Sequence, residues 1–215
     1  MKQLIKNKSY FFPLIICFAI ACNSPYTAKR TGYFKIDFPE HSYTTFNEQG
    51  YPYTFEYPSY ARPDKDNSVF NQDNPFWINI AFPGFHAKIY LTYKKIGGES
   101  ILKVKGPGGQ YHDSTVINKF PDLVNDAYNL SFKNDIKAYS IEDSIMHTPN
   151  GLTGVYFNLT GDVATAHQFF LSDTTKNFLR GALYFDATPN EDSLKPVNNF
   201  LQQDMKHLIN TLKWK

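Results

Sequence analysis

The sequence predicts an α+β fold in which an antiparallel sheet is covered by two helices. Apolar residues alternate on both sides of Pro83-Gly84, a pattern typical of a β-hairpin. Four more strand-like stretches between residues 137 and 186 are separated only by short turns, which indicates a meander. Two other stretches repeat apolar residues every three or four positions, as amphipathic helices do. We therefore expect a sheet of about six strands, a hairpin plus a four-strand meander, packed against two main helices.

An export signal precedes the predicted domain. Three lysines within the first eight residues come before an uncharged apolar run from 11 to 21. A basic start, a short apolar middle and small residues before a cleavage site are typical of a secretory signal. The run has about half of the roughly 20 apolar residues that a transmembrane helix needs. We therefore expect residues 1–21 to be removed as a signal peptide.

Cys22 directly follows the small residues of this signal, and the pattern resembles the bacterial lipobox. In that motif the cysteine sulfur is diacylated and the chain is cut just before the cysteine, here between Ala21 and Cys22. Ala19 departs from the leucine that is more usual three places before the cysteine. The alternative is a plain signal peptide with a chance cysteine, because short motifs are weak alone. Two or three acyl chains hold a protein firmly on a membrane, so we expect a lipid anchor at Cys22.

Removal of the signal peptide would leave a chain with almost equal numbers of basic and acidic residues. The precursor has 22 basic and 20 acidic residues, and three of the lysines lie in the signal, which leaves 19 against 20. This balance provides no basic field for nucleic acid. Cys17 also lies in the signal, so no disulfide is expected. A polar tether over 22–32 and a single α+β domain over 33–215 account for the rest.

Two strand-like stretches are expected at the start of the domain, at 33–38 and 51–57. The second places four aromatic side chains on one face: Tyr51, Tyr53, Phe55 and Tyr57. Such a stripe belongs either to the core or to a surface that stacks on sugars or on a partner protein. The core is the favoured interpretation, and Tyr51, Tyr53 and Tyr57 are kept as a candidate interaction surface.

Polar and glycine-rich segments flank the hairpin, whose strands are expected at 76–82 and 87–93. Acidic residues in the loop 59–74 have the spacing of a calcium loop, but the required glycine and final glutamate are missing, so no metal site is expected. The segment 97–109 does not match a phosphate-binding loop. We expect it to be a solvated loop.

The next helix is expected to begin at a cap formed by Asp113 or Ser114 and to continue to Ala127. Pro121 should kink or restart it. Strands are then expected at 137–147, 152–160, 164–171 and 177–186, with Asn150-Gly151 as a strong turn signal.

The last of these strands has apolar residues on both faces, so helices should cover both sides of the sheet. Arg180 on this strand is either a structural arginine with its hydrogen bonds satisfied inside the fold, which is favoured, or an anchor for an interaction partner.

Asp192 or Ser193 can cap the final helix, with Pro196 in its first turn. An apolar stripe runs along this helix to Leu212, and Trp214 should hold the helix end against the sheet.

No pattern of a catalytic site is recognised in the sequence. There is no G-x-S-x-G turn, and the six histidines lack the spacing of a zinc hydrolase. We predict no catalytic residues, no metal and no cofactor apart from the covalent lipid, and therefore no enzyme. A composite site assembled by folding stays open as an alternative.

Several longer stretches resemble the GldD family of gliding motility lipoproteins. They are YFKIDFPEH from Tyr33, YPYTFEYPSYA from Tyr51, FWINIAFPGFHAKIYLTYKKI from Phe76, and HQFFLSDTTKNFLRGALYFDATPNEDSLKPV from His167. The resemblance extends to about Trp214. It implies a role in gliding and a link to type IX secretion, and it carries no catalytic residues over to this chain. The order of strands and helices also looks like the PsbP/Mog1 type of sandwich, which implies a fold and no function.

The resemblance also implies a location. In these bacteria, lipoproteins sent to the cell exterior carry acidic residues just after the cysteine, and residues 23–28 contain none. We therefore expect an anchor that faces the periplasm, with the outer membrane favoured over the inner membrane. Motifs resembling O-glycosylation sites place candidate modifications on Ser144 and Ser193.

The expected function is that of a noncatalytic accessory or scaffold lipoprotein of the gliding and type IX secretion machinery. Its expected partners are envelope proteins of that machinery and, through acylated Cys22, membrane lipid. The alternative is a lipid-anchored module that binds peptidoglycan or another glycan through the tyrosine stripe.

Overall fold

The computed structural model describes residues 35–65, 74–133 and 136–215, and Asp37–Lys215 forms one compact unit. The expected signal peptide, Cys22 and the tether lie outside the described residues. Neither helix in the described part of the chain combines the length and the apolar character needed to cross a bilayer.

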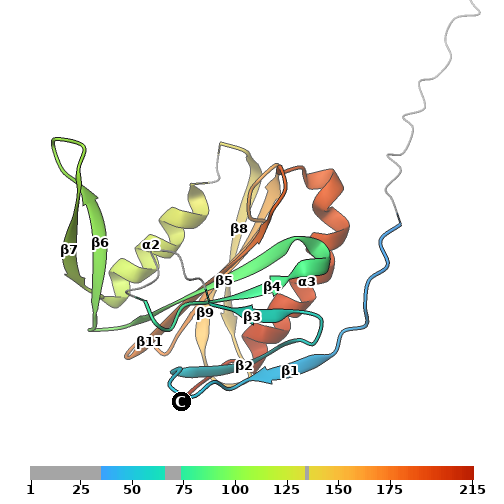
Figure 1. The fold of residues 1–215 in the computed structure, drawn as a ribbon, viewed down its shortest axis with the longest axis horizontal. Helices are drawn as coiled ribbons and strands as arrows, with labels where there is room; N and C mark the ends of the chain where they lie inside the picture. Colours follow the sequence, from blue (N-terminus) through green and yellow to red (C-terminus); the bar gives the residue numbers. More distant parts are fainter. Residues whose placement is uncertain (1–34, 66–73, 134–135) are drawn as a thin grey trace, which may run out of the picture. The chain divides into compact units, whose positions relative to one another are not determined.

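The main sheet is antiparallel and has seven strands (Figure 1). In spatial order they are β3 (Arg62–Asp64), β4 (Ile78–Phe82), β5 (Ala87–Lys95), β11 (Asn177–Phe185), β10 (His167–Ser172), β9 (Thr153–Gly161) and β8 (Ala138–His147). The predicted hairpin and the predicted four-strand meander are both confirmed, and a short 3-10 turn over Pro83–Phe85 closes the hairpin. Pairing of β5 with β11 joins the two parts into one sheet.

A second, three-stranded sheet consists of β1 (Tyr43–Phe46), β2 (Tyr53–Pro58) and β12 (Lys213–Trp214). The predicted strand at 33–38 is wrong over its described part, because residues 35–38 form no strand and β1 begins at Tyr43. Trp214 of β12 pairs with Tyr53 of β2. The Trp214 ring lies 6.3 Å from the ring of Tyr93 in the main sheet. The end of the chain is therefore joined to β2.

Helices contribute to the cores on both faces of the main sheet, as predicted (Figure 1). Helix α3 (Glu191–Thr211) and the three-stranded sheet pack on one face, where Leu201 and Met205 meet Phe55 and Leu91 in a fully buried cluster. Helix α2 (Phe120–Phe132) lies on the other face, and its buried side chains pack against Phe157, Phe170 and Phe178. The α+β class with an antiparallel sheet and two helices is confirmed.

The helix starts differ from the predicted ones. Asn190 caps α3 by accepting a hydrogen bond from the Ser193 N–H at 2.9 Å, so neither Asp192 nor Ser193 is the cap. As a result, Pro196 lies within the helix and not in its first turn. Pro121 occupies the first turn of α2, where no intrahelical N–H bond is required, so it starts the helix instead of kinking it.

Residues 99–117 form a two-stranded hairpin, where the sequence predicted a loop followed by the first turn of a helix. Strand β6 (Glu99–Lys105) pairs with β7 (Tyr111–Ile117), and Lys103 bridges Asp113 at 2.5 Å across the pair. The glycine-rich segment between them is the hairpin turn. The hairpin extends beyond the body of the domain beside α2 (Figure 1).

Candidate functional site

Two members of the predicted tyrosine surface are buried. Tyr51 is 5% exposed, and Tyr53 is fully buried and donates its hydroxyl to the Phe76 carbonyl at 2.5 Å. Tyr57 is half-buried and packs against the same core. The interaction surface proposed for Tyr51 and Tyr53 is therefore wrong, because the stripe faces α3 and the main sheet, and the favoured core interpretation is correct.

Arg180 makes a hydrogen bond inside the fold. Its guanidinium donates to the Gln168 side-chain oxygen, to which the Ser131 hydroxyl also donates at 3.2 Å. Burial lowers the pKa of Arg180, although the neighbouring Tyr184 acts in the opposite sense. These contacts are those of a structural arginine that links β10 and β11.

Both candidate glycosylation sites lie on the surface. Ser144 is exposed on β8, with its hydroxyl 3.5 Å from the Tyr156 carbonyl oxygen, and Ser193 is exposed in the first turn of α3. Their modification stays a prediction. The predicted lipidation of Cys22 lies outside the described residues and also stays a prediction.

A buried carboxylate on α3 forms hydrogen bonds with three side chains from the first part of the domain. Asp204 is 1% exposed, and its carboxylate accepts hydrogen bonds from the hydroxyls of Tyr43, at 3.1 Å, and Tyr60. His41 Nδ1 lies 2.7 Å from the same carboxylate. Burial and the Asp204 charge raise the pKa of Tyr43 to about 12 and also raise the pKa of Tyr60. Both phenols therefore stay protonated donors at neutral pH.

Aromatic stacking extends this Asp204 network. The His41 ring stacks on Phe200 at 4.4 Å, and the Tyr43 ring stacks on His207 at 3.5 Å. His207 in turn lies 2.7 Å from a Glu56 carboxylate oxygen on β2. These contacts fasten the segment before β1, and β1 itself, to α3. The sequence did not reveal the network, because its members lie up to 163 residues apart.

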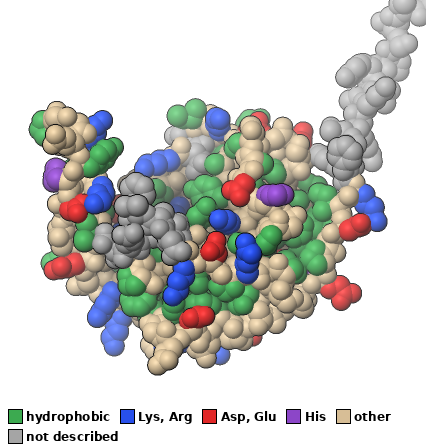
Figure 2. Space-filling view, viewed as in Figure 1, with side chains coloured by type: hydrophobic (Ala, Val, Ile, Leu, Met, Phe, Trp, Pro, Cys, Tyr) green, Lys and Arg blue, Asp and Glu red, His purple; other side chains and the backbone are tan. Residues whose placement is uncertain are grey.

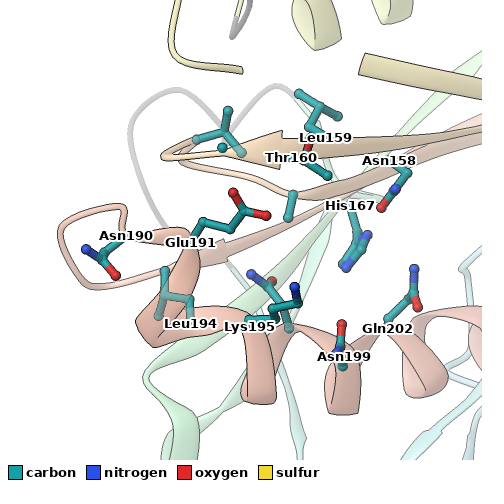
Figure 3. Close-up of a pocket in the computed structure, with 14 residues that line it drawn as sticks. Asn158, Leu159, Thr160, His167, Asn190, Glu191, Leu194, Lys195, Asn199 and Gln202 are labelled. Atoms are coloured by element: carbon teal, nitrogen blue, oxygen red, sulfur yellow. The ribbon is translucent and has the colours of Figure 1, made fainter. Parts of the chain in front are cut away.

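A polar pocket of about 290 Å³ lies between α3 and the neighbouring ends of β9 and β10. Asn158 and Thr160 of β9 and His167 of β10 face Lys195, Asn199 and Gln202 of α3 across it (Figure 3). Asn190, Glu191 and Asn198 complete its polar lining. Side-chain amides, which both donate and accept hydrogen bonds, therefore dominate the walls.

Two polar atoms at this pocket have no hydrogen-bond partner among the described residues. They are Nδ1 of His167, which is only 5% exposed, and the side-chain oxygen of Asn198. Burial, with a smaller effect of Lys206, lowers the pKa of His167 to about 4, so the imidazole is neutral at pH 7. Buried polar groups are normally paired, so unpaired ones at one pocket point to a polar ligand or water there.

Sequence reasoning missed this polar pocket. The paired amides Asn198-Asn199 and Gln202-Gln203 were a usable signal, because they flank the apolar stripe of the last helix. Their partners on β9 and β10 come from a segment about 40 residues earlier, and only the fold brings the two together.

The β6–β7 hairpin exposes apolar side chains on both of its faces. Register places Ile101, Tyr111 and Ile117 on one face and Leu102 and Val104 on the other. We call these five residues the hairpin surface; Tyr111 is 68% exposed and Ile117 is 59% exposed. In Figure 2 the apolar side chains visible on this hairpin lie among lysine, histidine and acidic side chains. Exposed apolar patches with polar rims mark interaction sites.

Three comparisons relate the chain to known proteins. No curated protein sequence matches it. Among solved structures it is similar to cyanobacterial PsbP (CyanoP) from Synechocystis sp. PCC 6803, with a TM-score of 0.45 and 9% sequence identity over 82% of this chain and 95% of that chain. The family described as gliding motility lipoprotein GldD matches residues 23–214. The chain therefore belongs to the GldD family of gliding motility lipoproteins.

Proposed function

We propose that this protein is a noncatalytic, lipid-anchored accessory component of the gliding and type IX secretion machinery. Its acylated Cys22 would hold the domain on a membrane facing the periplasm, with the outer membrane favoured over the inner. Membership of the GldD family and the lipobox-like sequence support this proposal. The domain would act by binding envelope proteins of the machinery.

The observation that carries the proposal is the hairpin surface. An isolated two-stranded hairpin is marginally stable in water, and within the described residues most side chains on both faces of β6–β7 are exposed. A partner that buries Ile101, Tyr111 and Ile117 would remove apolar area from water and stabilise the hairpin. The salt bridge between Lys103 and Asp113 lies on the same face and would fix the geometry of that contact.

A second surface supports protein binding as the mode of action. Strand β8 is ten residues long and forms one edge of the main sheet, so one side of its backbone pairs with no neighbouring strand in the described part of the chain. Its side chains Tyr139 and Ile145 are exposed. Edge strands of this kind can accept an added strand from a partner.

Glycan binding through the tyrosine stripe is ruled out, because Tyr51 and Tyr53 are buried. The main proposal is tested by replacing an exposed isoleucine of the hairpin surface. Ile117→Ser removes an apolar contact without disturbing the core, and Ile136→Ser is the matched control, since Ile136 is 93% exposed elsewhere on the domain.

The measurement is gliding speed, together with partner recovery after crosslinking in cells and mass spectrometry. Ile117→Ser should lower both at an unchanged level of the protein, and Ile136→Ser should leave both unchanged. Normal gliding and normal partner recovery in the Ile117→Ser strain would contradict the proposal.

A further inference from the structure

We propose that the polar pocket between α3 and strands β9 and β10 binds a neutral N-acetylated hexosamine. This inference goes beyond the accessory role, which needs no small ligand. It also assigns saccharide binding to a different place from the buried tyrosine stripe. The chemical class follows from the pocket's size, charge and hydrogen-bonding groups.

The size of the pocket suits a single sugar ring. Small-molecule sites have volumes of about 300–1,000 Å³. At about 290 Å³ this pocket is at the lower end of that range. It is therefore too small to enclose a long oligosaccharide, but one residue of a glycan chain could enter it.

The charge of the lining favours a neutral ligand. Among the described residues, Glu191 and Lys195 are the only charged ones that line the pocket, and they carry opposite charges one helical turn apart on α3. His167 is kept neutral by its burial. An anion or a cation would therefore meet no net opposite charge in the pocket.

The polar groups match those of an acetamido sugar. Sugar hydroxyls need neighbours that both donate and accept, and the amides of Asn158, Asn199 and Gln202 do both. An acetamido group adds one N–H donor and one carbonyl acceptor. The unpaired side-chain oxygen of Asn198 can accept from that N–H, and His167 offers an unpaired ring nitrogen that is nine-tenths buried.

The apolar part of the lining suits the acetyl methyl group. Leu194 of α3 lines the pocket, whereas the side chains of Leu159, Val163 and Ala166 pack into the core on the α2 face of the sheet. Leu194 is aliphatic, so it offers a contact for a methyl group and not a platform for ring stacking. A plain hexose would leave Leu194 without this contact, and the site should therefore discriminate in favour of the acetylated sugar.

The test uses the full lipidated chain in detergent micelles and ligand-observed NMR titrations. N-acetylglucosamine should bind saturably, and glucose, its counterpart without the acetamido group, should bind about tenfold more weakly or not at all. Asn198→Leu and the nearly isosteric Thr160→Val should each weaken binding about fivefold, the effect of one uncharged hydrogen bond. Asn125→Leu makes the same amide replacement on the exposed face of α2 and should leave binding unchanged.

The outcomes are distinct. Absence of saturable binding, equal binding of glucose, or equal effects of Asn198→Leu and Asn125→Leu would each overturn the inference and leave a pocket filled by water. Thermal unfolding of each variant separates a lost contact from a lost fold. Co-sedimentation with purified cell-wall sacculi then distinguishes a wall glycan from a free saccharide as the source. None of these measurements depends on gliding, so their failure would not affect the proposed accessory role.

Discussion

Replacing Asp204 with alanine tests whether one buried carboxylate holds the start of the domain against α3. The variant leaves His41, Tyr43 and Tyr60 without their common acceptor. A hydrogen bond to a charged group contributes about 1.5–3 kcal/mol, and removal of the carboxylate also removes the cost of burying its charge. The His41 side chain is 28% exposed, so water can replace part of the loss. We therefore expect a loss of about 3 kcal/mol in the free energy of unfolding.

The assay is denaturant unfolding at pH 7, with thermal unfolding as a second readout. A loss of about 3 kcal/mol corresponds to a decrease of roughly 6–12 °C in Tm for a domain of this size. Asp192→Ala is the control, because it removes an exposed aspartate from the first turn of the same helix and should cost about 0.3–1 kcal/mol. If the two variants lose similar free energies of unfolding, the Asp204 network does not stabilise the domain.

Three other perturbations test separate parts of the structure. His167 has a pKa of about 4 when folded and an ordinary value of 6.5, so between these pH values the unfolded chain binds a proton that the folded chain does not. The free energy of unfolding should therefore fall by about 3 kcal/mol as the pH falls through this window. In unfolding curves measured from pH 7 to pH 4, His167→Gln should remove most of this pH dependence. An equal pH dependence in the variant and the unchanged protein would refute the attribution to His167. A Cβ added at Gly181 would collide with the Phe169 ring, whereas one at Gly84 would meet open space. Gly181→Ala should therefore cost about 1–3 kcal/mol in unfolding experiments, and a cost no greater than that of Gly84→Ala would count against the packing described. Cys22→Ala should abolish incorporation of labelled palmitate and release the protein from the membrane fraction, and persistent labelling would rule out Cys22 as the acylated residue.

The parts of the fold predicted correctly are those with strong local patterns. The alternation of apolar residues around Pro83-Gly84 predicted the β4–β5 hairpin with nearly correct bounds. The turn signal at Asn150-Gly151 did the same for the β8–β9 hairpin. The β6–β7 hairpin was missed because apolar residues lie on both of its faces, so no alternation identifies a buried side. The helix was then extended backward because Val116 and Ile117 are three or four residues before Phe120, although both belong to β7.

The candidate sites were harder to predict than the fold, because each joins residues that are distant in sequence. The Asp204 network connects α3 with the first described residues of the domain, and the polar pocket connects α3 with β9 and β10. The tyrosine stripe is a local pattern that the sequence shows clearly, but its location in the fold is ambiguous. A stripe of alternating aromatic residues is compatible with a core face or an exposed face, and only the position of α3 decides that Tyr53 is buried.

The pairing of β12 with β2 has a consequence for biogenesis. A chain that emerges N-terminus first, from a ribosome or from a translocation channel, presents β2 long before residues 191–214 are available. Until then Tyr53 and Phe55 lack the cover that α3 provides. Such uncovered aromatic side chains favour aggregation during the delay, so nascent chains should depend on a chaperone that shields this strand until the last helix arrives.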